Sequence, residues 1–168
     1  TDPAPAQALI GWPGYGGGDA FTLRPGQALT LNGVAQGYAA DRVRSLLAAE
    51  GFGEALVDLG EYAALGGPFL LGVEDPVFGE IATRRLTGGA IATSSPPAMF
   101  IGAAEHILGP HGEMPVWSTV SVEAESAGLA DGLSTAFCLA DAPRIRRILP
   151  ALPAVTRVTL VSRDGDVT

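Results

Sequence analysis

Residues 28–51 read ALTLNGVAQGYAADRVRSLLAAEG. Residues Ala28–Leu31 alternate in polarity like a short β-strand, and Asn32 is a residue type that caps helices. Apolar residues then recur at three- and four-residue spacing, the period of a helix, until Gly51 ends the pattern. The stretch predicts a strand, a tight turn and a helix.

The rest of the chain predicts further strands and two more helices. Short apolar or alternating runs predict strands at Ala55–Leu59, Phe69–Val73, Arg85–Thr93, Ser118–Ala124 and Val155–Ser162. Helical periodicity predicts helices over Ala127–Ala140 and Ala142–Leu149. Because these elements do not alternate as regular βαβ units, we expect an α+β fold, with a mixed or antiparallel sheet and about three helices.

Composition excludes several kinds of site. The 168 residues are 47% hydrophobic and 17% charged, which indicates one packed domain, expected over residues 26–168 after a Gly/Pro-rich segment or linker at 1–25. All ten basic residues are arginines, so no lysine can bind a phosphate or form a Schiff base. A net charge of −8 argues against nucleic-acid binding. One cysteine and two histidines are too few for a Cys/His zinc site, so any metal should be bound by oxygen atoms.

The predicted helix at 127–140 has one face of short polar side chains. Asp131, Ser134, Thr135 and Cys138 share this face, opposite an apolar one. Without long charged side chains, the polar face should allow a ligand to approach closely. A carboxylate and a hydroxyl one turn apart suit Mg²⁺, which uses one or two carboxylates together with substrate oxygens. The alternative is a polar face packed against a loop.

His106 precedes a Gly-Pro-His-Gly run that predicts a tight turn at residues 109–112. A histidine held near a surface by such a turn could act as a general base. The alternative is an ordinary surface histidine. Cys138 is expected to be a small buried side chain without chemistry.

Five motifs in the chain form a recognisable set. They are LTLNGVAQGYAAD at 29–41, LVDLG at 56–60, AIATS at 90–94, HILGP at 106–110 and ADGLSTA at 130–136. In order and approximate spacing, this set resembles the ApbE-type FAD:protein FMN transferases, from about residue 28 to the end of the chain. The resemblance implies the ApbE-like fold, which is related to the T-fold, and covers the C-terminal half to two-thirds of such a protein.

The resemblance also implies site residues. It assigns Mg²⁺ contacts to Asp131, Thr135 and the backbone carbonyls of Ser134 and Gly33, and a catalytic role to His106. The cofactor-binding residues that it implies are Thr30, Gln36, Tyr38, Thr93, Ser94 and Leu108.

The implied reaction is the Mg²⁺-dependent transfer of FMN from FAD to a serine or threonine hydroxyl of an acceptor flavoprotein, with release of AMP. The family's N-terminal portion is absent or replaced by the first 25 residues, so a second chain or a homodimer partner is expected to complete the site. The resemblance also implies a location in the periplasm or on the outer side of a membrane, although no signal pattern opens the chain.

Several positions depart from the family pattern. Thr30 replaces an Asp, Gln36 replaces a Lys or Glu, Gly109 replaces an Asp, and Gly60-Glu61-Tyr62 stands where Gly-Gly-Asp/Asn is usual. These changes leave two alternatives to an active transferase: a flavin-binding module without turnover, and a pseudoenzyme that keeps the fold for protein contacts.

Overall fold

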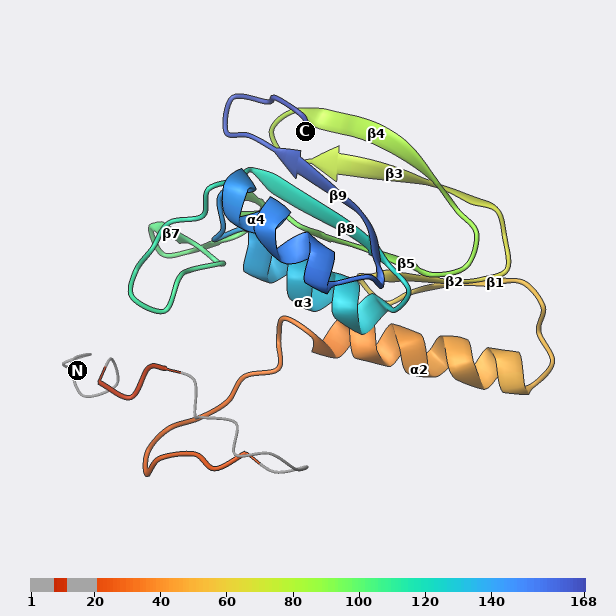
Figure 1. Ribbon diagram of the computed structural model, residues 1–168, viewed down its shortest axis with the longest axis horizontal. Helices are drawn as coiled ribbons and strands as arrows, with labels where there is room; N and C mark the ends of the chain where they lie inside the picture. Colours follow the sequence, from red (N-terminus) through yellow and green to blue (C-terminus); the bar gives the residue numbers. More distant parts are fainter. Residues whose placement is uncertain (1–7, 12–20) are drawn as a thin grey trace.

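The computed structural model of the chain describes residues 8–11 and 21–168. Within them it has three α-helices: α2 (Ala35–Ala49), α3 (Ala127–Phe137) and α4 (Ala142–Ile148). The strands are β1 (Ala55–Asp58), β2 (Tyr62–Leu65), β3 (Phe69–Asp75), β4 (Gly79–Leu86), β5 (Ala90–Ser94), β6 (Phe100–Ile101), β7 (Ala104–Glu105), β8 (Thr119–Ala124) and β9 (Val155–Val161). Short 3-10 turns at Pro96–Ala98 and Leu149–Ala151 complete the regular structure of this part of the chain (Figure 1).

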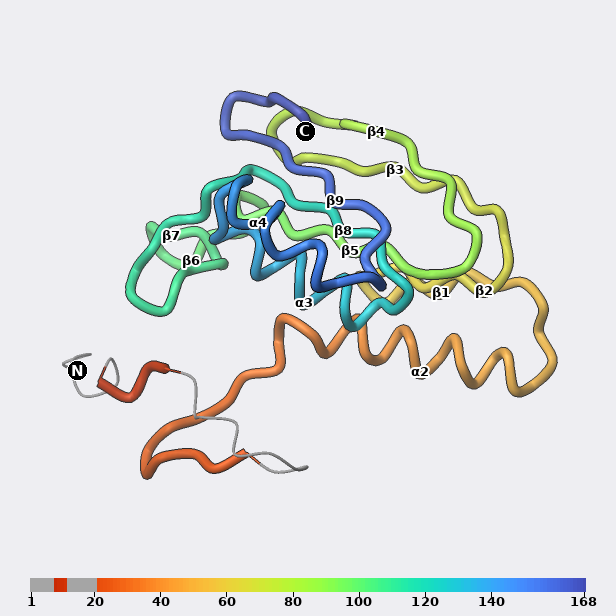
Figure 2. The backbone as a smooth tube through the Cα atoms, viewed as in Figure 1, coloured from red at the N-terminus to blue at the C-terminus, as the bar shows by residue number. Residues whose placement is uncertain are grey.

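The central element is a five-stranded antiparallel sheet in the order β1-β2-β5-β8-β9. Helices α2 and α3 pack side by side on one face, with α2 against β1 and β2 and α3 against β5 and β8. The β3–β4 hairpin covers part of the other face, as the backbone trace shows (Figure 2). The α+β class and the antiparallel sheet are confirmed.

The sheet is buried on both faces because successive side chains of a strand point in opposite directions. Ala63 and Ala90 pack against the helices, in a cluster with Ala40 and Ala127. Their chain neighbours Ala64 and Ile91 pack against the hairpin, with Leu71 and Leu86. The small residues on the helix side allow α2 and α3 to lie close to the sheet.

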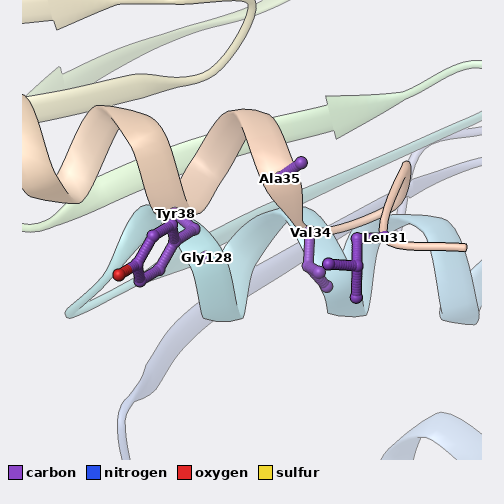
Figure 3. Close-up of a pocket in the computed structure, with 5 residues that line it drawn as sticks. All are labelled: Leu31, Val34, Ala35, Tyr38 and Gly128. Atoms are coloured by element: carbon purple, nitrogen blue, oxygen red, sulfur yellow. The ribbon is translucent and has the colours of Figure 1, made fainter.

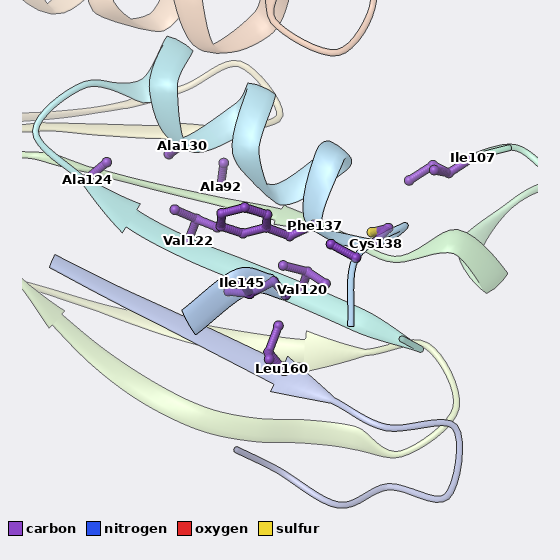
Figure 4. Packing of buried hydrophobic residues seen from close by; sticks show 11 residues of the cluster. Ala92, Ile107, Val120, Val122, Ala124, Ala130, Phe137, Cys138, Ile145 and Leu160 are labelled. Atoms are coloured by element: carbon purple, nitrogen blue, oxygen red, sulfur yellow. The ribbon is translucent and has the colours of Figure 1, made fainter. Parts of the chain in front are cut away.

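The largest apolar cluster lies between α3, α4 and the strands β8 and β9. Phe137 of α3 and Ile145 of α4 meet Val120, Val122 and Leu160 there (Figure 4). Because α3 is fixed against the sheet by this cluster, its other side is available to build a site. None of the helices in the described residues has the length and hydrophobicity needed to cross a membrane.

Two predictions about the start of this region are wrong. Ala28–Leu31 is not a strand: it is exposed and irregular, and none of the described strands pairs with it. Asn32 does not cap α2; its N–H donates to Oγ1 of Thr30 at 3.3 Å, and Val34 takes the N-cap position without a side-chain bond. The segment reaches α2 through the turn at residues 32–34.

Other boundaries also differ. The predicted strand at 85–93 is the end of β4, a turn at Gly88 and Gly89, and most of β5. Strand β2 and the polar first half of β4 were not predicted, and neither were the two-residue strands β6 and β7. The helices predicted over 127–140 and 142–149 end earlier, at Phe137 and Ile148.

Candidate functional site

A pocket of about 720 Å³ is lined mainly by residues from four parts of the fold. They are the start of α2 with the turn before it, the end of β5, the segment from residue 98 to 108, and α3. Of the site residues predicted from the sequence, all except Tyr38 and Ser134 line it. The nine that do are Thr30, Gly33, Gln36, Thr93, Ser94, His106, Leu108, Asp131 and Thr135. The fold therefore brings four separate sequence motifs to one place.

Tyr38 lies elsewhere. The residue is 64% exposed and lines a shallow apolar pocket of about 490 Å³ with Leu31, Val34, Ala35 and Gly128 (Figure 3). This pocket offers almost no polar atoms for a phosphate or a sugar. Tyr38 is not among the residues that line the polar pocket, and the prediction that it contacts the cofactor stays untested.

Asp131 of α3 is the most buried carboxylate lining the polar pocket, with 4% of its surface exposed. Its Oδ2 accepts a hydrogen bond from the backbone N–H of Gly37 at 3.0 Å. That N–H lies in the first turn of α2, where no helix carbonyl can accept it. Burial raises the pKa of Asp131, and the bond from Gly37 offsets only part of the rise.

The close approach of the helices requires Gly37. A Cβ atom there would lie 2.3 Å from the carbonyl oxygen of Ala127 and 2.8 Å from Cβ of Asp131. Asp41, one turn further along α2, in turn accepts from the N–H groups of Ala127 and Gly128 at 2.9 Å each. Each helix therefore caps the N-terminus of the other, and this fixes the position of Asp131 relative to α2.

A chain of hydroxyl groups lies between α3 and β5. Ser94 Oγ is 2.8 Å from Ser134 Oγ and 3.2 Å from Thr135 Oγ1, and Ser134 donates to the carbonyl of Asp131 at 3.0 Å. Since Ser134 uses its proton there, Ser94 is the donor to Ser134 and Thr135 is the donor to Ser94. The lone pairs of Thr135 Oγ1 are left for a ligand. Ser134 itself is fully buried behind the pocket.

The polar face of α3 is less accessible than the sequence indicated. Asp131, Ser134 and Cys138 are all buried, because this face packs against β5 and α2. Only Asp131 and Thr135 reach the pocket. Burial raises the pKa of Cys138 to about 12, and its thiol donates to the carbonyl of Ser134 at 3.2 Å, which agrees with a structural role.

The oxygen atoms at this end of the pocket are of the kind that Mg²⁺ prefers as ligands. No group of three or more His, Cys, Asp or Glu side chains in residues 8–11 and 21–168 could bind a metal alone. The backbone turn at Gly33 lies next to Thr135, since a Cβ on Gly33 would be 3.6 Å from Thr135 Oγ1. Asp131, Thr135 and the carbonyl of Gly33 are hard oxygen donors, and Mg²⁺ takes such partial sets together with substrate oxygens.

His106 lies in the same pocket. Its Nδ1 is 3.1 Å from the carbonyl oxygen of Pro96 and 3.3 Å from that of Met99. Because carbonyl oxygens only accept, Nδ1 carries the proton and Nε2 of the neutral ring is a proton acceptor. The predicted turn after it exists, with the N–H of Gly112 bonded to the carbonyl of Gly109 at 3.0 Å.

Glu61 was not predicted as a site residue, yet it lines the pocket with 7% of its surface exposed. Its Oε2 accepts from the backbone N–H of Thr93 at 3.2 Å. Burial, together with the nearby charge of Asp131, raises the pKa of Glu61 to about 8. Gln36 holds the preceding turn by donating to the carbonyl of Leu59 at 3.2 Å. The departure from the family pattern at position 61 was the one available signal.

Comparison with known proteins gives consistent matches. The model of the ApbE family matches residues 4–159. The ApbE protein of Thermotoga maritima is 27% identical with a TM-score of 0.76, over 87% of this chain and 52% of that one. The flavinyl transferase ApbE of Pseudomonas stutzeri is 27% identical with a TM-score of 0.66, over 83% and 47%.

The flavin transferase ApbE of Vibrio cholerae shares the fold, with a TM-score of 0.70 at 22% identity, over 86% of this chain and 51% of that one. The chain therefore spans about half the length of these solved structures. No curated protein matches it.

Proposed function

The chain belongs to the ApbE family, and on that premise we propose that it transfers FMN from FAD to a serine or threonine hydroxyl of an acceptor flavoprotein, releasing AMP. One observation carries the proposal. Asp131 and Thr135, whose side chains carry oxygen ligands, line the same pocket as His106, whose Nε2 is available to accept a proton. Phosphoryl transfer depends on positioning and charge neutralisation, and this pocket has groups for both.

The reaction forms one bond and breaks one. The acceptor hydroxyl oxygen bonds to the FMN phosphorus, and the bond from that phosphorus to the bridging oxygen of the diphosphate breaks, so AMP leaves with that oxygen. The hydroxyl proton passes to Nε2 of His106, which the carbonyls of Pro96 and Met99 hold in the accepting tautomer.

A bound Mg²⁺ would stabilise the negative charge of the diphosphate. The residues that would hold it are Asp131, Thr135 and the carbonyl of Gly33. A cation is needed because the described residues lining the pocket include two carboxylates and neither lysine nor arginine. Thr30, Gln36, Thr93, Ser94 and Leu108 would form the walls that contact FAD.

A second candidate is a flavin-binding module without turnover. Glu61 favours it, because its side chain lines the pocket where the family pattern has a glycine, and its ionised form would repel a diphosphate. The two candidates differ in one measurement. The transferase releases AMP from FAD, whereas the module retains the flavin absorbance on purification and releases none.

Further partners follow from the same proposal. The shallow pocket at Tyr38 is apolar and exposed. A second chain, or a second copy of this one, would then complete the flavin site. Family resemblance favours a location in the periplasm or on the outer side of a membrane, which cell fractionation would test.

A further inference from the structure

The polar pocket contains two buried carboxylates that no cationic side chain neutralises. Glu61 and Asp131 are 7% and 4% exposed. The ion pairs of the described residues involve Asp41, Glu105 and Glu123, and neither pocket carboxylate. Burying a charge without a partner is costly, so burial favours the protonated form of both carboxyls, and a bound cation would favour their ionised form instead.

Each carboxylate is held in place through one oxygen only. Oε2 of Glu61 accepts from Thr93 N–H at 3.2 Å, and Oδ2 of Asp131 accepts from Gly37 N–H at 3.0 Å. Within the described residues no hydrogen bond reaches Oε1 of Glu61 or Oδ1 of Asp131. Two fixed carboxylates, each with a free oxygen, therefore belong to the same pocket.

The electrostatics of the pair agree with this geometry. Burial is the main cause of the raised pKa of Glu61, and repulsion by the charge of Asp131 is the second. A divalent cation would remove that repulsion. Mg²⁺ and Mn²⁺ are suitable, because both prefer carboxylate and other oxygen ligands.

We propose that Glu61 is an additional ligand of the cation site, so that Glu61 and Asp131 together bind a divalent cation before any nucleotide enters. The inference deepens the proposed function, on which it rests through the shared residue Asp131. A second carboxylate adds one protein ligand and one negative charge, so the site should bind a cation, with water as the remaining ligands, before substrate phosphates arrive.

The test is a titration of the chain with Mn²⁺ in the absence of nucleotide, followed by electron paramagnetic resonance of the free ion. We expect wild type to bind one Mn²⁺, and Glu61→Gln and Asp131→Asn each to weaken that binding by about tenfold or more. Gln keeps an oxygen for Thr93 N–H, so the fold should persist, and circular dichroism checks this. Glu74→Gln, a change at an exposed carboxylate of β3, is the matched control and should bind like wild type.

Two results would overturn the inference: wild type that binds no Mn²⁺ without nucleotide, or Glu61→Gln that binds it as tightly as wild type. AMP release from FAD is measured on the same samples. If wild type releases AMP and Glu61→Gln binds Mn²⁺ as tightly as wild type, Glu61 is not a ligand, and the proposed function still holds. If Glu61→Gln weakens Mn²⁺ binding but wild type releases no AMP, the transferase function is refuted, and the cation site at Glu61 and Asp131 still holds.

Discussion

Asp131 of α3 accepts a hydrogen bond from the backbone N–H of Gly37 in the first turn of α2, at 3.0 Å. The bond joins residues 94 positions apart in the chain. It caps α2 from another helix, and it fixes the carboxylate that we expect to bind the cation. The position of the site therefore depends on the contact between these two helices.

Gly37→Ala should destabilise the protein by about 1–3 kcal/mol, the usual range for an overpacked core. The added Cβ would meet the carbonyl of Ala127 at 2.3 Å, and backbone atoms can yield only if the helices separate. Urea unfolding followed by circular dichroism measures the loss.

Gly128→Ala is the matched control for this change. It is also a helical glycine, but its Cβ would have no neighbour closer than 3.5 Å. Alanine has the higher helix propensity, so this variant should be as stable as wild type or more stable. Equal unfolding midpoints for Gly37→Ala and wild type would show that the helices are not in close contact.

His106→Ala should slow AMP release about 10²–10⁴-fold, the usual effect of removing a general base, while FAD affinity changes little. The reason is that its Nε2 is available to accept the proton of the acceptor hydroxyl. Single-turnover kinetics and calorimetric FAD binding separate the two effects. His111→Ala is the control, since the side chain of His111 lies outside the polar pocket. Unaltered turnover in His106→Ala would make this residue an ordinary surface histidine.

The stability of the chain should fall in acid, partly because of Asp75. Burial alone would raise its pKa, but hydrogen bonds from Ser118, Thr119 and the N–H groups of Val77 and Phe78 lower the pKa below its usual value. A carboxyl with a lower pKa in the folded state stabilises the fold above its unfolded pKa, and this contribution disappears as the pH falls through the folded value.

The free energy of unfolding should therefore decrease below about pH 4. Asp75→Asn should already be less stable at pH 7, and its stability should depend less on pH in the acid range. Urea unfolding between pH 3 and 7 measures both, with Glu74→Gln as a control for the loss of a neighbouring exposed charge. An acid dependence of Asp75→Asn identical to that of wild type would contradict the role of Asp75.

Local patterns predicted most of the elements that pack through a repeating apolar face. The helices near 127 and 142 and the strands near 118 and 155 follow from such periodicity. Strand β2 has four residues, and half of β4 is polar, so neither repeats long enough to be detected. Ala28–Leu31 alternates like a strand but pairs with none of the described strands, and sequence spacing cannot reveal a missing partner.

The sequence predicted most of the residues that line the polar pocket, but not all of them. The motifs around Gly33, Ser94, His106 and Asp131 do meet in one pocket. The burial of Glu61 was not predictable, because it depends on the neighbouring strand β5 and on α3, which are distant in sequence.

The central claim is tested by incubating the chain with FAD, Mg²⁺ and a peptide that contains one threonine, followed by mass spectrometry of the peptide. A peptide with valine in place of that threonine controls for non-covalent flavin. The account predicts that the threonine peptide alone gains the mass of FMN less one water, with an equal amount of AMP released. Flavin bound to the chain, with neither AMP nor a modified peptide, would contradict it.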